Sequence, residues 1–298
     1  MPAIDELRER IAAACPAPGR YDPMPRVTLM RADAPTPTGG TIYEPVACFA
    51  AQGSKRLILG KRIYAYDPSH YLVVAVGLPV IAAVTEASPE RPYLALALRL
   101  DPALIATLLI EMPGTAGPRS AGIGIASIGP DLLDPVVRLA RLADRPGDAA
   151  ALAPLAEREV LYRLLSGPQG AMLRQVALAD SRLAQVARAV AWIRANYHRP
   201  LRIEALAELS AMSPATLHRH FRAVTELSPL QFQKHVRLQE ARRRLLANAA
   251  DARHVGFAVG YDSPSQFSRE YTRLFGAPPA RDAARLRTGG DAPEAAVP

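Results

Sequence analysis

The chain has 298 residues, 49% of them hydrophobic, and a mean hydropathy of +0.02. This length is large for one domain, so we expect two, each with a packed core. The only cysteines, Cys15 and Cys48, are too few for a disulfide framework or a four-cysteine zinc site.

The net charge of +8 comes entirely from one end of the chain. Residues 1–180 carry 18 basic and 18 acidic side chains, whereas residues 181–298 carry 18 basic and 10 acidic ones. Arginine outnumbers lysine 33 to 3, which indicates a compositional bias, but a bias does not explain the asymmetry between the two parts. The asymmetry predicts a polyanionic partner for the C-terminal part.

Neither the first residues of the chain nor its longest apolar run suggests a membrane segment. The first residues, MPAIDELRERIAAAC, are charged throughout and lack the apolar core of a signal peptide. The longest apolar run, YLVVAVGLPVIAAV from Tyr71 to Val84, is too short to span a bilayer and contains Gly77 and Pro79. We therefore expect a cytoplasmic protein with no membrane partner.

From Arg26 to about Leu100 the sequence alternates short β-like runs with turn signals. The runs are RVTLMRA, VACFAAQG, KRLILG, KRIYAY, HYLVVAV, PVIAAVTEA and YLALALRL. Turn signals every 8–12 residues or so are typical of an antiparallel sandwich or small barrel. We expect a barrel over about residues 26–112.

After Leu100 the hydrophobic period becomes helical. Helices are predicted for DPALIATLLIEM, GPDLLDPVVRLARLAD and APLAEREVLYRLLSG, the last two over about residues 130–166, with Asp101 and Asp131 as N-caps. The apolar stripe from Leu155 to Leu165 packs either on the barrel or on a second subunit, so monomer and homodimer both remain open. Residues 114–129, which are rich in Gly, Ala and Ser, are predicted to form a loop.

Beyond Ser181 the pattern is helical throughout. The predicted helices are SRLAQVARAVAWIRANY, RIEALAELSAM, SPATLHRHFRAV, a long basic helix over about residues 229–247, DARHVGFAVGY, SPSQFSREYTRLFG and PPARDAARLR. Residues 288–298, rich in Gly, Pro and Ala, are expected to be a disordered tail.

One short phrase occurs twice in this region. SPATLHRHF, from Ser213, and SPSQFSREY, from Ser263, are offset by 50 residues. In each phrase the serine is a good N-cap, and the proline fits the first helical turn because no backbone donor is needed there. The region is therefore predicted to be a duplicated helix-turn-helix, over about residues 203–224 and 252–275.

The second helix of each unit has one apolar stripe, formed by Leu217, Phe221 and Val224 in the first and by Phe267, Tyr271 and Leu274 in the second. The stripe faces a core, so the polar early turns form the exposed face, as in a recognition helix that enters the major groove. The predicted base contacts are Ala215, His218, Arg219, Arg222, Ser265, Gln266, Ser268 and Arg269. Arg219 and Arg269 are expected to be the main readers. The alternative, a solvated face with incidental charge, does not account for the duplication.

These motifs resemble the DNA-binding domain of the AraC/XylS family of transcription regulators, over about residues 181–287. The stretch VGFAVGYDSPSQFSREYTRLFGAPP, from Val255, is similar to the signature of that family, and its length makes the match specific. The resemblance implies a bacterial, sequence-specific regulator whose two units, joined by the long helix, read successive major-groove segments on one side of a promoter. Activation and repression are both left open.

The resemblance also implies phosphate contacts from basic residues of the linker helix and of the second recognition helix. These are Lys234, Arg237, Arg242, Arg243 and Arg273, with Arg244 beside them. Asp282 stands where many members carry an aromatic residue, so we expect the last helix to pack differently. Ala215 and Pro264 stand where larger polar contacts often occur, which narrows the expected direct readout.

The N-terminal half resembles the N-terminal domain of one AraC subgroup, over about residues 26–165. The matching stretches are YEPVACFAAQGSKRLILG, HYLVVAVGLPV and ASPERPYLALALRLDP, together with Tyr66. The resemblance implies a cupin-like barrel that senses a small molecule or mediates pairing. The predicted fold class is therefore α+β with two domains: a cupin-like β-barrel with flanking helices (1–175) and an all-α double helix-turn-helix (181–287).

A cupin-like barrel can also be a metalloenzyme, whose metal centre needs two or three histidines and a carboxylate. Residues 1–180 contain a single histidine, His70, and no nucleophile–base pair or phosphate-binding glycine loop. We therefore expect no catalysis, no metal and no other cofactor. A DNA binder that senses nothing is a second alternative, but the size of the barrel half argues against it.

The expected partners are double-stranded promoter DNA and a small-molecule effector, with RNA polymerase left open. The candidate effector residues are amphipathic residues on or beside predicted strands: Tyr43, Cys48, Tyr64, Tyr66 and Tyr71. Most of them are equally compatible with a core position. A redox role for Cys48 would require a lowered thiol pKa.

Overall fold

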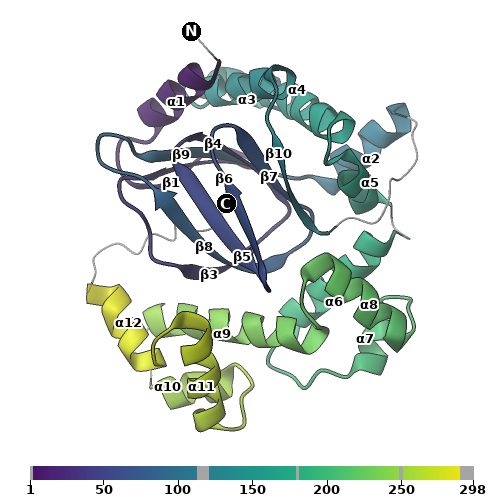
Figure 1. Cartoon of the computed structure of the whole chain (residues 1–298). Helices are drawn as coiled ribbons and strands as arrows, with labels where there is room; N and C mark the ends of the chain where they lie inside the picture. The colour runs from purple at the N-terminus through teal and green to yellow at the C-terminus, as the bar shows by residue number, and fades with distance from the viewer. Residues whose placement is uncertain (1–2, 113–120, 179–180, 248–250, 289–298) are drawn as a thin grey trace.

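The computed structural model describes residues 3–112, 121–178, 181–247 and 251–288 (Figure 1). The first part contains α1 (Ala3–Ala14), β1 (Gly19–Met24), β2 (Val27–Ala32), β3 (Gly39–Tyr43), β4 (Val46–Gln52), β5 (Ser54–Leu59), β6 (Arg62–Tyr66), β7 (His70–Val74), β8 (Leu78–Glu86), β9 (Tyr93–Arg99), α2 (Pro102–Glu111), β10 (Ile123–Ser127), α3 (Pro130–Leu142), α4 (Pro146–Ser166) and α5 (Gly170–Ala177). The second part contains α6 (Arg182–Ala195), α7 (Ile203–Leu209), α8 (Pro214–Thr225), α9 (Pro229–Ala247), α10 (Ala252–Ala258), α11 (Pro264–Phe275) and α12 (Pro279–Thr288). We call residues 3–178 the β-domain and residues 181–288 the helical domain.

Two antiparallel sheets enclose the core of the β-domain. One has the strand order β1-β2-β9-β4-β7-β10 and the other the order β3-β8-β5-β6. Helices α1, α3 and α4 lie along the outer side of the larger sheet (Figure 1). Strands β4 and β9 are therefore buried on both faces, which explains their nearly continuous runs of Val, Ala and Leu.

The fold class is the predicted one, with a β-rich N-terminal part and a helical C-terminal part. The barrel is not closed by hydrogen bonds, because within the described residues the two sheets share no strand pair. The arrangement is an open sandwich of the cupin-like, jelly-roll kind. Its strands enclose an interior, as the turn spacing predicts.

The sheet extends beyond residues 26–112 at both ends. Strand β1 precedes this range, and β10 lies inside the stretch predicted to be a loop, where it pairs with β7 from Ile123 opposite Val74 to Ser127 opposite His70. The loop prediction is wrong for this strand, while residues 113–120 and the predicted tail at 289–298 lie outside the described residues. Gly124 of β10 packs against Gln169, since an added Cβ would lie 2.5 Å from Gln169 Oε1.

Of the two predicted helix caps, one is present. Asp101 accepts hydrogen bonds from the amides of Ala103 and Leu104 at 2.9 and 3.4 Å and begins α2. Asp131 lies within the first turn of α3, which is preceded by Gly129 as N-cap. The carboxylate of Asp131 still lies near the positive end of the helix dipole.

The apolar stripe of α4 packs mainly within its own domain. Val160, Leu161, Leu164 and Leu165 are buried, whereas Leu155 is 64% exposed. The stripe therefore contributes to the core that α4 shares with α3 and α5.

The helical domain is arranged around α9, a 19-residue helix that spans about 28 Å. Helices α6, α7 and α8 lie at one end of α9, and helices α10, α11 and α12 lie at the other (Figure 1). In α6 the predicted stripe of Leu183, Val186, Val190 and Ile193 is buried. The linker helix thus holds the two helix-turn-helix units at opposite ends.

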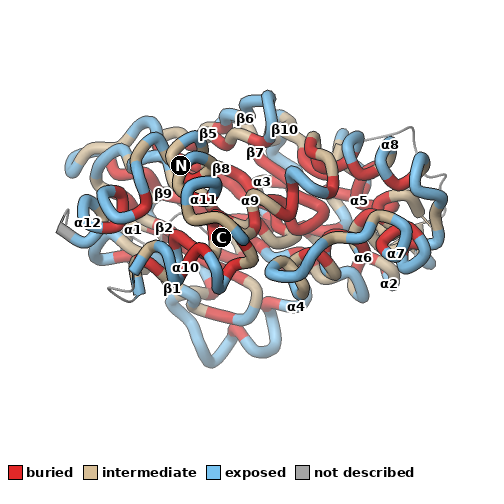
Figure 2. The backbone as a smooth tube through the Cα atoms, turned by 90° about the horizontal axis from the view of Figure 1, so that it is seen from below, coloured by how far each residue is buried: buried red, intermediate tan, exposed pale blue. Residues whose placement is uncertain are grey.

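The two units belong to different hydrophobic cores. Leu206, Leu217, Phe221 and Val224 of the first unit are part of the same continuous core as the β-domain. The second unit has a separate core, made by Leu238, Ala241, Leu245, Val255, Val259, Tyr261, Phe267, Tyr271 and Ala283. In Figure 2 the outer turns of α8 and α12 are exposed, while the strands are largely buried. The first unit therefore shares its hydrophobic core with the β-domain, whereas the second unit has a core of its own.

Candidate nucleic-acid interface and effector site

The recognition helices α8 and α11 begin and end in the same way. The side chains of Ser213 and Ser263 each accept a hydrogen bond, at 3.3 Å, from the amide three residues on. A proline follows each cap, in the first turn. Each helix ends at a residue with left-handed backbone, Glu226 with φ 59° and Gly276 with φ 78°. These matching ends are what a duplicated unit predicts.

The exposed faces of α8 and α11 carry the predicted base-contacting residues. Leu217, Phe221 and Val224 are buried in α8, as are Phe267 and Tyr271 in α11. Of the eight predicted base contacts, Ser268 is half-buried and the others are exposed: Ala215, His218, Arg219, Arg222, Ser265, Gln266 and Arg269. The two helices therefore present polar surfaces of similar composition.

One base-contact candidate, Gln266, is already engaged. Its Nε2 donates to Glu270 Oε1 at 3.2 Å, and the same oxygen accepts from Lys234 Nζ at 2.8 Å. The Tyr261 hydroxyl donates to the other oxygen at 2.8 Å. Burial raises the pKa of Glu270, but the hydrogen bonds from Lys234, Tyr261 and Gln266 outweigh it and hold this pKa below its ordinary value. Glu270 therefore joins α11 to the linker helix.

The predicted phosphate contacts have unequal environments. Arg273 and Arg243 are exposed, and Arg243 pairs with Glu240 at 2.7 Å. Lys234 is paired with Glu270 but is 43% exposed. Arg237 donates to the carbonyl oxygens of Tyr197 and Arg199 at 2.6 and 3.0 Å. Arg237 is thus held against the segment that follows α6, whereas Arg273 and Arg243 face solvent.

The structure contradicts the predicted phosphate contact of Arg242. Its side chain is only 8% exposed and pairs with Asp282 at 2.9 Å. Its guanidinium also lies 4.6 Å from the centroid of the Phe275 ring. A guanidinium enclosed in this way is an internal structural group and cannot contact a DNA phosphate in this conformation.

Asp282, which departs from the family pattern, is the acceptor at the centre of a buried network. It is fully buried and accepts from Arg242 Nε at 2.9 Å, from the Tyr271 hydroxyl at 3.0 Å and from Arg285 at 2.9 Å. These bonds connect α9, α11 and α12. The last helix is therefore held by a buried carboxylate, at a position where many members of the family carry an aromatic residue.

The five effector candidates fall into three places. Tyr43, Cys48 and Tyr66 meet in the interior of the sandwich. Tyr71 lies opposite Phe49 in the β4–β7 pair and stacks on it at 5.9 Å, on the other face of the sheet from Cys48. Tyr64 lies near Arg62 and Glu226, at the boundary between the domains.

Two further residues, Lys55 and Tyr93, complete the interior group. The Tyr66 and Tyr93 hydroxyls are hydrogen-bonded at 3.2 Å, and Lys55 Nζ lies 5.4 Å from the centroid of the Tyr43 ring. We call Tyr43, Cys48, Lys55, Tyr66 and Tyr93 the inner cluster. All five are buried.

Burial changes the protonation chemistry of the inner cluster. It raises the pKa of the Cys48 thiol to about 12 and lowers that of the Lys55 ammonium group from 10.5 to about 8. Cys48 is therefore a protonated thiol at neutral pH and lacks the lowered pKa that a redox role would require. Lys55 Nζ and the Tyr43 hydroxyl make no hydrogen bond, although Tyr66 lies near Tyr43.

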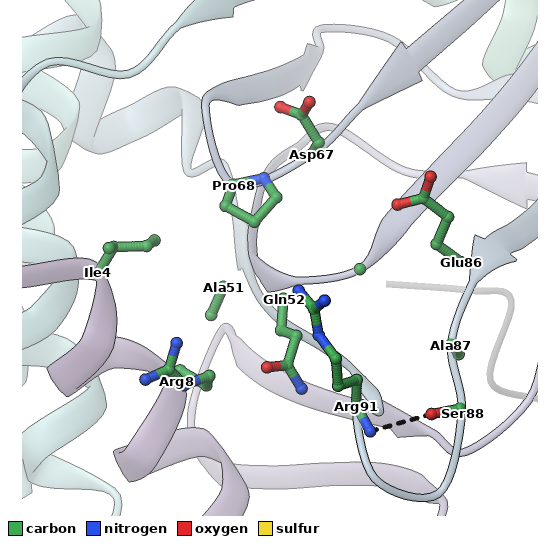
Figure 3. Close-up of a pocket in the computed structure, with 11 residues that line it drawn as sticks. Ile4, Arg8, Ala51, Gln52, Asp67, Pro68, Glu86, Ala87, Ser88 and Arg91 are labelled. Carbon is green, nitrogen blue, oxygen red and sulfur yellow. Dashed lines mark hydrogen bonds between the residues drawn. The ribbon is translucent and has the colours of Figure 1, made fainter.

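An open pocket of about 580 Å³ lies at one end of the strands (Figure 3). It is lined by Ile4, Arg8, Ala51, Gln52, Gly53, Asp67, Pro68, Glu86, Ala87, Ser88 and Arg91. Figure 3 shows the carboxylates of Asp67 and Glu86 on one side and the guanidinium groups of Arg8 and Arg91 on the other. The pocket thus presents both signs of charge to a ligand.

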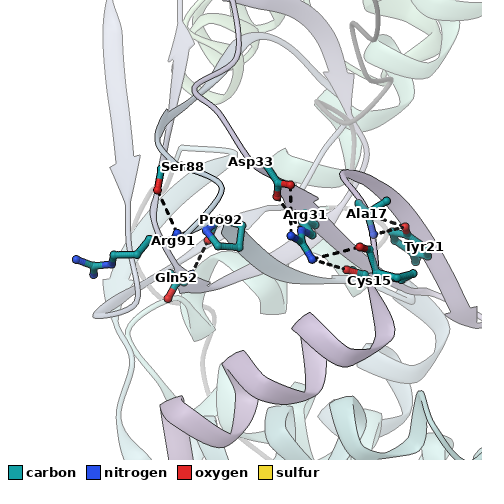
Figure 4. A network of polar contacts seen from close by, with 10 residues as sticks. Cys15, Ala17, Tyr21, Arg31, Asp33, Gln52, Ser88, Arg91 and Pro92 are labelled. Atoms are coloured by element: carbon teal, nitrogen blue, oxygen red, sulfur yellow. Dashed lines mark hydrogen bonds and ion pairs between the residues drawn. The ribbon is translucent and has the colours of Figure 1, made fainter.

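The rim of this pocket is fixed by polar contacts (Figure 4). Gln52 donates to the Pro92 carbonyl oxygen at 2.8 Å, and the Arg91 amide donates to the Ser88 hydroxyl at 3.1 Å. Gly53 has a φ of +74°, and a Cβ there would lie 2.3 Å from the Glu86 carbonyl oxygen and 3.3 Å from Tyr93 Cβ. Glycine is required at this position by both its backbone conformation and its close packing.

The domains meet at the C-terminal ends of both recognition helices. The Gly122 amide donates to the Val224 carbonyl oxygen at 3.0 Å, and Arg62 pairs with Glu226 at 3.3 Å. At α11, a Cβ added to Gly40 would lie 2.9 Å from the Phe275 ring. The early turns, which carry the base-contact candidates, lie at the other ends of these helices.

Two further ionic and polar contacts join the domains away from the recognition helices. Arg194 of α6 forms a two-pronged ion pair with Glu44. Gln239 of α9 donates to the Val80 carbonyl oxygen at 3.3 Å.

The described residues contain no group of three or more His, Cys, Asp or Glu side chains placed to hold a metal ion. Across the same parts of the chain, no helix combines the length and apolar character needed to cross a membrane.

The sequence matches two protein families in the expected order. Residues 23–172 match the family described as AraC-type transcriptional regulator N-terminus, and residues 206–285 match a helix-turn-helix domain. The chain is 29% identical to the HTH-type transcriptional activator RhaS of Escherichia fergusonii over 143 residues, which is 47% of this chain and 49% of that protein. It is also 29% identical to RhaS of Salmonella schwarzengrund over 164 residues, or 54% of this chain and 56% of that protein. The chain thus spans about half the length of the curated relatives it matches.

Solved structures of ToxT from Vibrio cholerae share the overall fold. An apo ToxT variant from strain SCE256 has a TM-score of 0.56 at 8% identity, covering 88% of this chain and 98% of that one. ToxT from strain O395 bound to (E)-4-(8-methylnaphthalen-1-yl)but-3-enoic acid has a TM-score of 0.57 at 10% identity, covering 87% and 98%. At these identities the likeness shows a shared fold. Since the first family match covers half of the chain and a duplicated helix-turn-helix follows it, the chain belongs to the AraC-type transcriptional regulators.

Proposed function

We propose that this protein is a sequence-specific, DNA-binding transcription regulator whose β-domain binds a small molecule. The observation that carries the proposal is the pair of recognition helices α8 and α11, with similar exposed faces, at the two ends of one linker helix. The linker helix spans about 28 Å, close to the ~34 Å repeat of B-DNA. This spacing supports reading of successive major-groove segments on one side of the duplex.

Base contacts are proposed for the exposed residues of α8 and α11, with Arg219 and Arg269 as the main readers. Phosphate contacts are proposed for Arg273, Arg243 and Lys234, the last after release from Glu270. Arg237 is a weaker candidate because its guanidinium is bound to backbone carbonyl groups. Arg242 is omitted because it is buried.

The test compares Arg219→Ala and Arg269→Ala with wild type, on an operator selected from random DNA and on a scrambled duplex. Each substitution is expected to cost about 1–3 kcal/mol on the operator and much less on the scrambled DNA. Fluorescence anisotropy at fixed salt measures both affinities. Arg281→Ala, which removes an exposed arginine of α12, is the matched control.

Unchanged operator preference in both variants would refute the proposed base readers. An equal loss on both DNAs would instead indicate phosphate contacts at Arg219 and Arg269.

The relatives support two finer proposals. RhaS is named a transcriptional activator, which favours activation, and with it a contact to RNA polymerase, over repression. One ToxT structure contains a naphthyl butenoic acid and another an unsaturated fatty acid, which favours a small organic effector in this fold. We further propose that the protein acts in the bacterial cytoplasm, as a monomer or homodimer, without catalysing a reaction.

A further inference from the structure

Lys55 is a lysine buried in the interior of the β-domain. It is 1% exposed, yet its Nζ has no hydrogen-bond partner among the residues that the structure describes. Of the described groups, the titratable one that acts on Lys55 is the Cys48 thiol, and no carboxylate does so. An unpaired buried ammonium group is strongly disfavoured. We therefore expect the lysine at position 55 to bind a ligand or to take part in a reaction.

The choice of lysine at position 55 is informative in this chain. Arginine outnumbers lysine 33 to 3, so a position that needs only a positive charge is filled by arginine almost throughout. The other two lysines are Lys61, which is exposed, and Lys234, which is paired with Glu270. An amine differs from a guanidinium chiefly in that it can lose its proton and act as a nucleophile.

The surroundings of Lys55 favour the neutral amine. Within the described parts of the chain no carboxylate stabilises the ammonium form, and burial lowers the pKa of Lys55 to about 8. Relative to an ordinary lysine, this shift raises the neutral fraction near pH 7.5 by roughly two orders of magnitude. Cys48, the other buried nucleophile of the cluster, is shifted the opposite way. Lys55 is thus the activated nucleophile of the sandwich interior.

We propose that Lys55 captures the effector covalently and reversibly, and that the effector is a small aldehyde held as an imine. This inference rests on the proposed function, because it names the chemical class of the molecule that the β-domain senses. The Lys55 amine adds to the carbonyl carbon to give a carbinolamine. One amine hydrogen passes to the carbonyl oxygen in this addition; the carbinolamine then loses its hydroxyl group and the remaining N–H hydrogen as one water molecule, and a C=N bond remains. No oxidant or reductant is consumed.

The neighbours of Lys55 suit this reaction. Tyr66 faces Lys55 directly across the β5–β6 pair, and its hydroxyl is bonded to that of Tyr93 at 3.2 Å. This hydroxyl pair can donate a hydrogen bond to the oxygen that leaves as water. The ring of Tyr43 lies against Nζ and excludes bulk water. A neutral imine at this place removes the cost of the buried charge.

The pocket of Figure 3 lies at the end of the strands where this cluster begins. Gly53 is two residues before Lys55, Asp67 follows Tyr66, and Arg91 is two residues before Tyr93. Gly53, in the pocket wall, packs closely against Cα and Cβ of Tyr93, a member of the cluster. This is the side from which we expect the aldehyde to enter.

Reductive trapping on the full-length protein tests the proposal. The protein is incubated with butanal, benzaldehyde or glycolaldehyde in the presence of sodium cyanoborohydride, and modified lysines are located by peptide mass spectrometry. We expect Lys55 to be alkylated at least about tenfold faster than the exposed Lys61, because more of its amine is neutral. Lys61→Arg is expected to leave this labelling unchanged. Labelling confined to Lys61, Lys234 or the N-terminal amine overturns the proposal.

Ligand-induced stabilisation gives a second, independent readout. Butanal is expected to raise the Tm of the wild type and not that of Lys55→Arg, which keeps the charge but cannot form an imine. Butan-1-ol and butanoate, matched in chain length, are expected to have no effect. Stabilisation by butanoate but not by butanal shows a non-covalent anion site and overturns the imine. Lys55→Met tests folding without a charge, so that a misfolded Lys55→Arg does not decide the outcome.

Operator binding separates this inference from the function on which it rests. If the operator is bound but neither Lys55 labelling nor affinity responds to aldehydes, the protein remains a DNA-binding regulator and the imine is wrong. If no DNA is selected while Lys55 is labelled rapidly, the proposed DNA function fails and the covalent site stands.

Discussion

At the scale of single residues, Lys55 determines how the stability of the β-domain depends on pH. The folded protein holds this group at a pKa of about 8 against 10.5 for an exposed lysine. Below pH 8 the group is charged in both the folded and the unfolded protein, and its burial lowers the free energy of unfolding. Between pH 8 and 10.5 the folded protein loses this proton first, so the penalty disappears as the pH rises.

Lys55→Met is therefore expected to stabilise the protein by up to about 3 kcal/mol below pH 8, with a gain that shrinks towards pH 10. Urea unfolding of both proteins between pH 7 and 10 measures this gain. The thiol of Cys48 and the hydroxyls of Tyr43 and Tyr66, which face Lys55, have raised pKa values and stay protonated over this range. A gain that does not vary with pH would show that folding does not lower the pKa of Lys55.

The sequence indicates that Lys55 lies in the interior, although the predicted effector residues do not include it. Strand β5 alternates in burial, with Lys55, Leu57 and Leu59 inside. The period of two in SKRLIL places Lys55 on the same face as the two leucines. Amphipathic character singles out Tyr43, Tyr64, Tyr66 and Tyr71 alike and cannot show which sheet face a residue occupies. That depends on strand register, so Tyr71 was grouped with Tyr43 and Tyr66 although it lies on the outer face.

At the scale of elements, the buried network of Asp282 determines whether the second helix-turn-helix unit holds together. Asp282 joins α9 through Arg242, α11 through Tyr271 and α12 through its own backbone. Asp282→Ala leaves Arg242 buried without a counter-ion, which typically costs about 3–5 kcal/mol. We expect the separate core of this unit to unfold at lower urea than the rest of the molecule.

Circular dichroism and hydrogen exchange of α11 and α12 measure this effect, and Arg281→Ala on the exposed side of α12 is the control. The double variant Arg242→Met with Asp282→Leu replaces the ion pair by apolar groups and is expected to recover most of the loss. A double variant as unstable as Asp282→Ala would mean that the charge pair is not the cause.

Helical periodicity shows why Arg242 was misassigned. In α9 the positions 238, 241, 242 and 245 lie three and four apart, and all four are buried. The buried stripe can be predicted from its leucines, but Arg242 within it was assigned to the surface because its partner Asp282 is 40 residues away in the sequence.

Strand β10 was missed for a related reason. Its pairing with β7 is a tertiary contact that a short, Gly- and Ala-rich stretch does not indicate.

At the scale of the whole molecule, the duplication and the order of the domains were readable from sequence, whereas the docking of the domains was not. The repeat can be predicted from local features of the sequence alone, such as a serine cap, a proline and an apolar stripe. The docking depends on isolated contacts such as Arg194 with Glu44, which no periodic pattern marks. The division into two cores likewise appears only when the chain is folded.

Because the first unit shares its hydrophobic core with the β-domain, we expect a change in the β-domain to affect this unit more than the second one. Gly122 lies between the β-domain and the first unit: a Cβ there would be 2.9 Å from Val76 Cγ2 and 3.0 Å from Val224 Cγ1. Gly122→Ala is therefore expected to push the end of α8 away from the β-domain, at an overpacking cost of about 1–3 kcal/mol. Gly147→Ala, where an added Cβ meets nothing within 4 Å, is the matched control.

Hydrogen exchange read by mass spectrometry distinguishes the two units. In Gly122→Ala, the amides at the C-terminal end of α8 are expected to exchange about tenfold faster or more. Those of α11 should be unchanged, because the second unit has its own core. Equal acceleration in both recognition helices would show that the linker helix transmits the disturbance. Unchanged exchange in α8 would show that its stability does not depend on the β-domain, so a ligand there would have to act on DNA binding by another route.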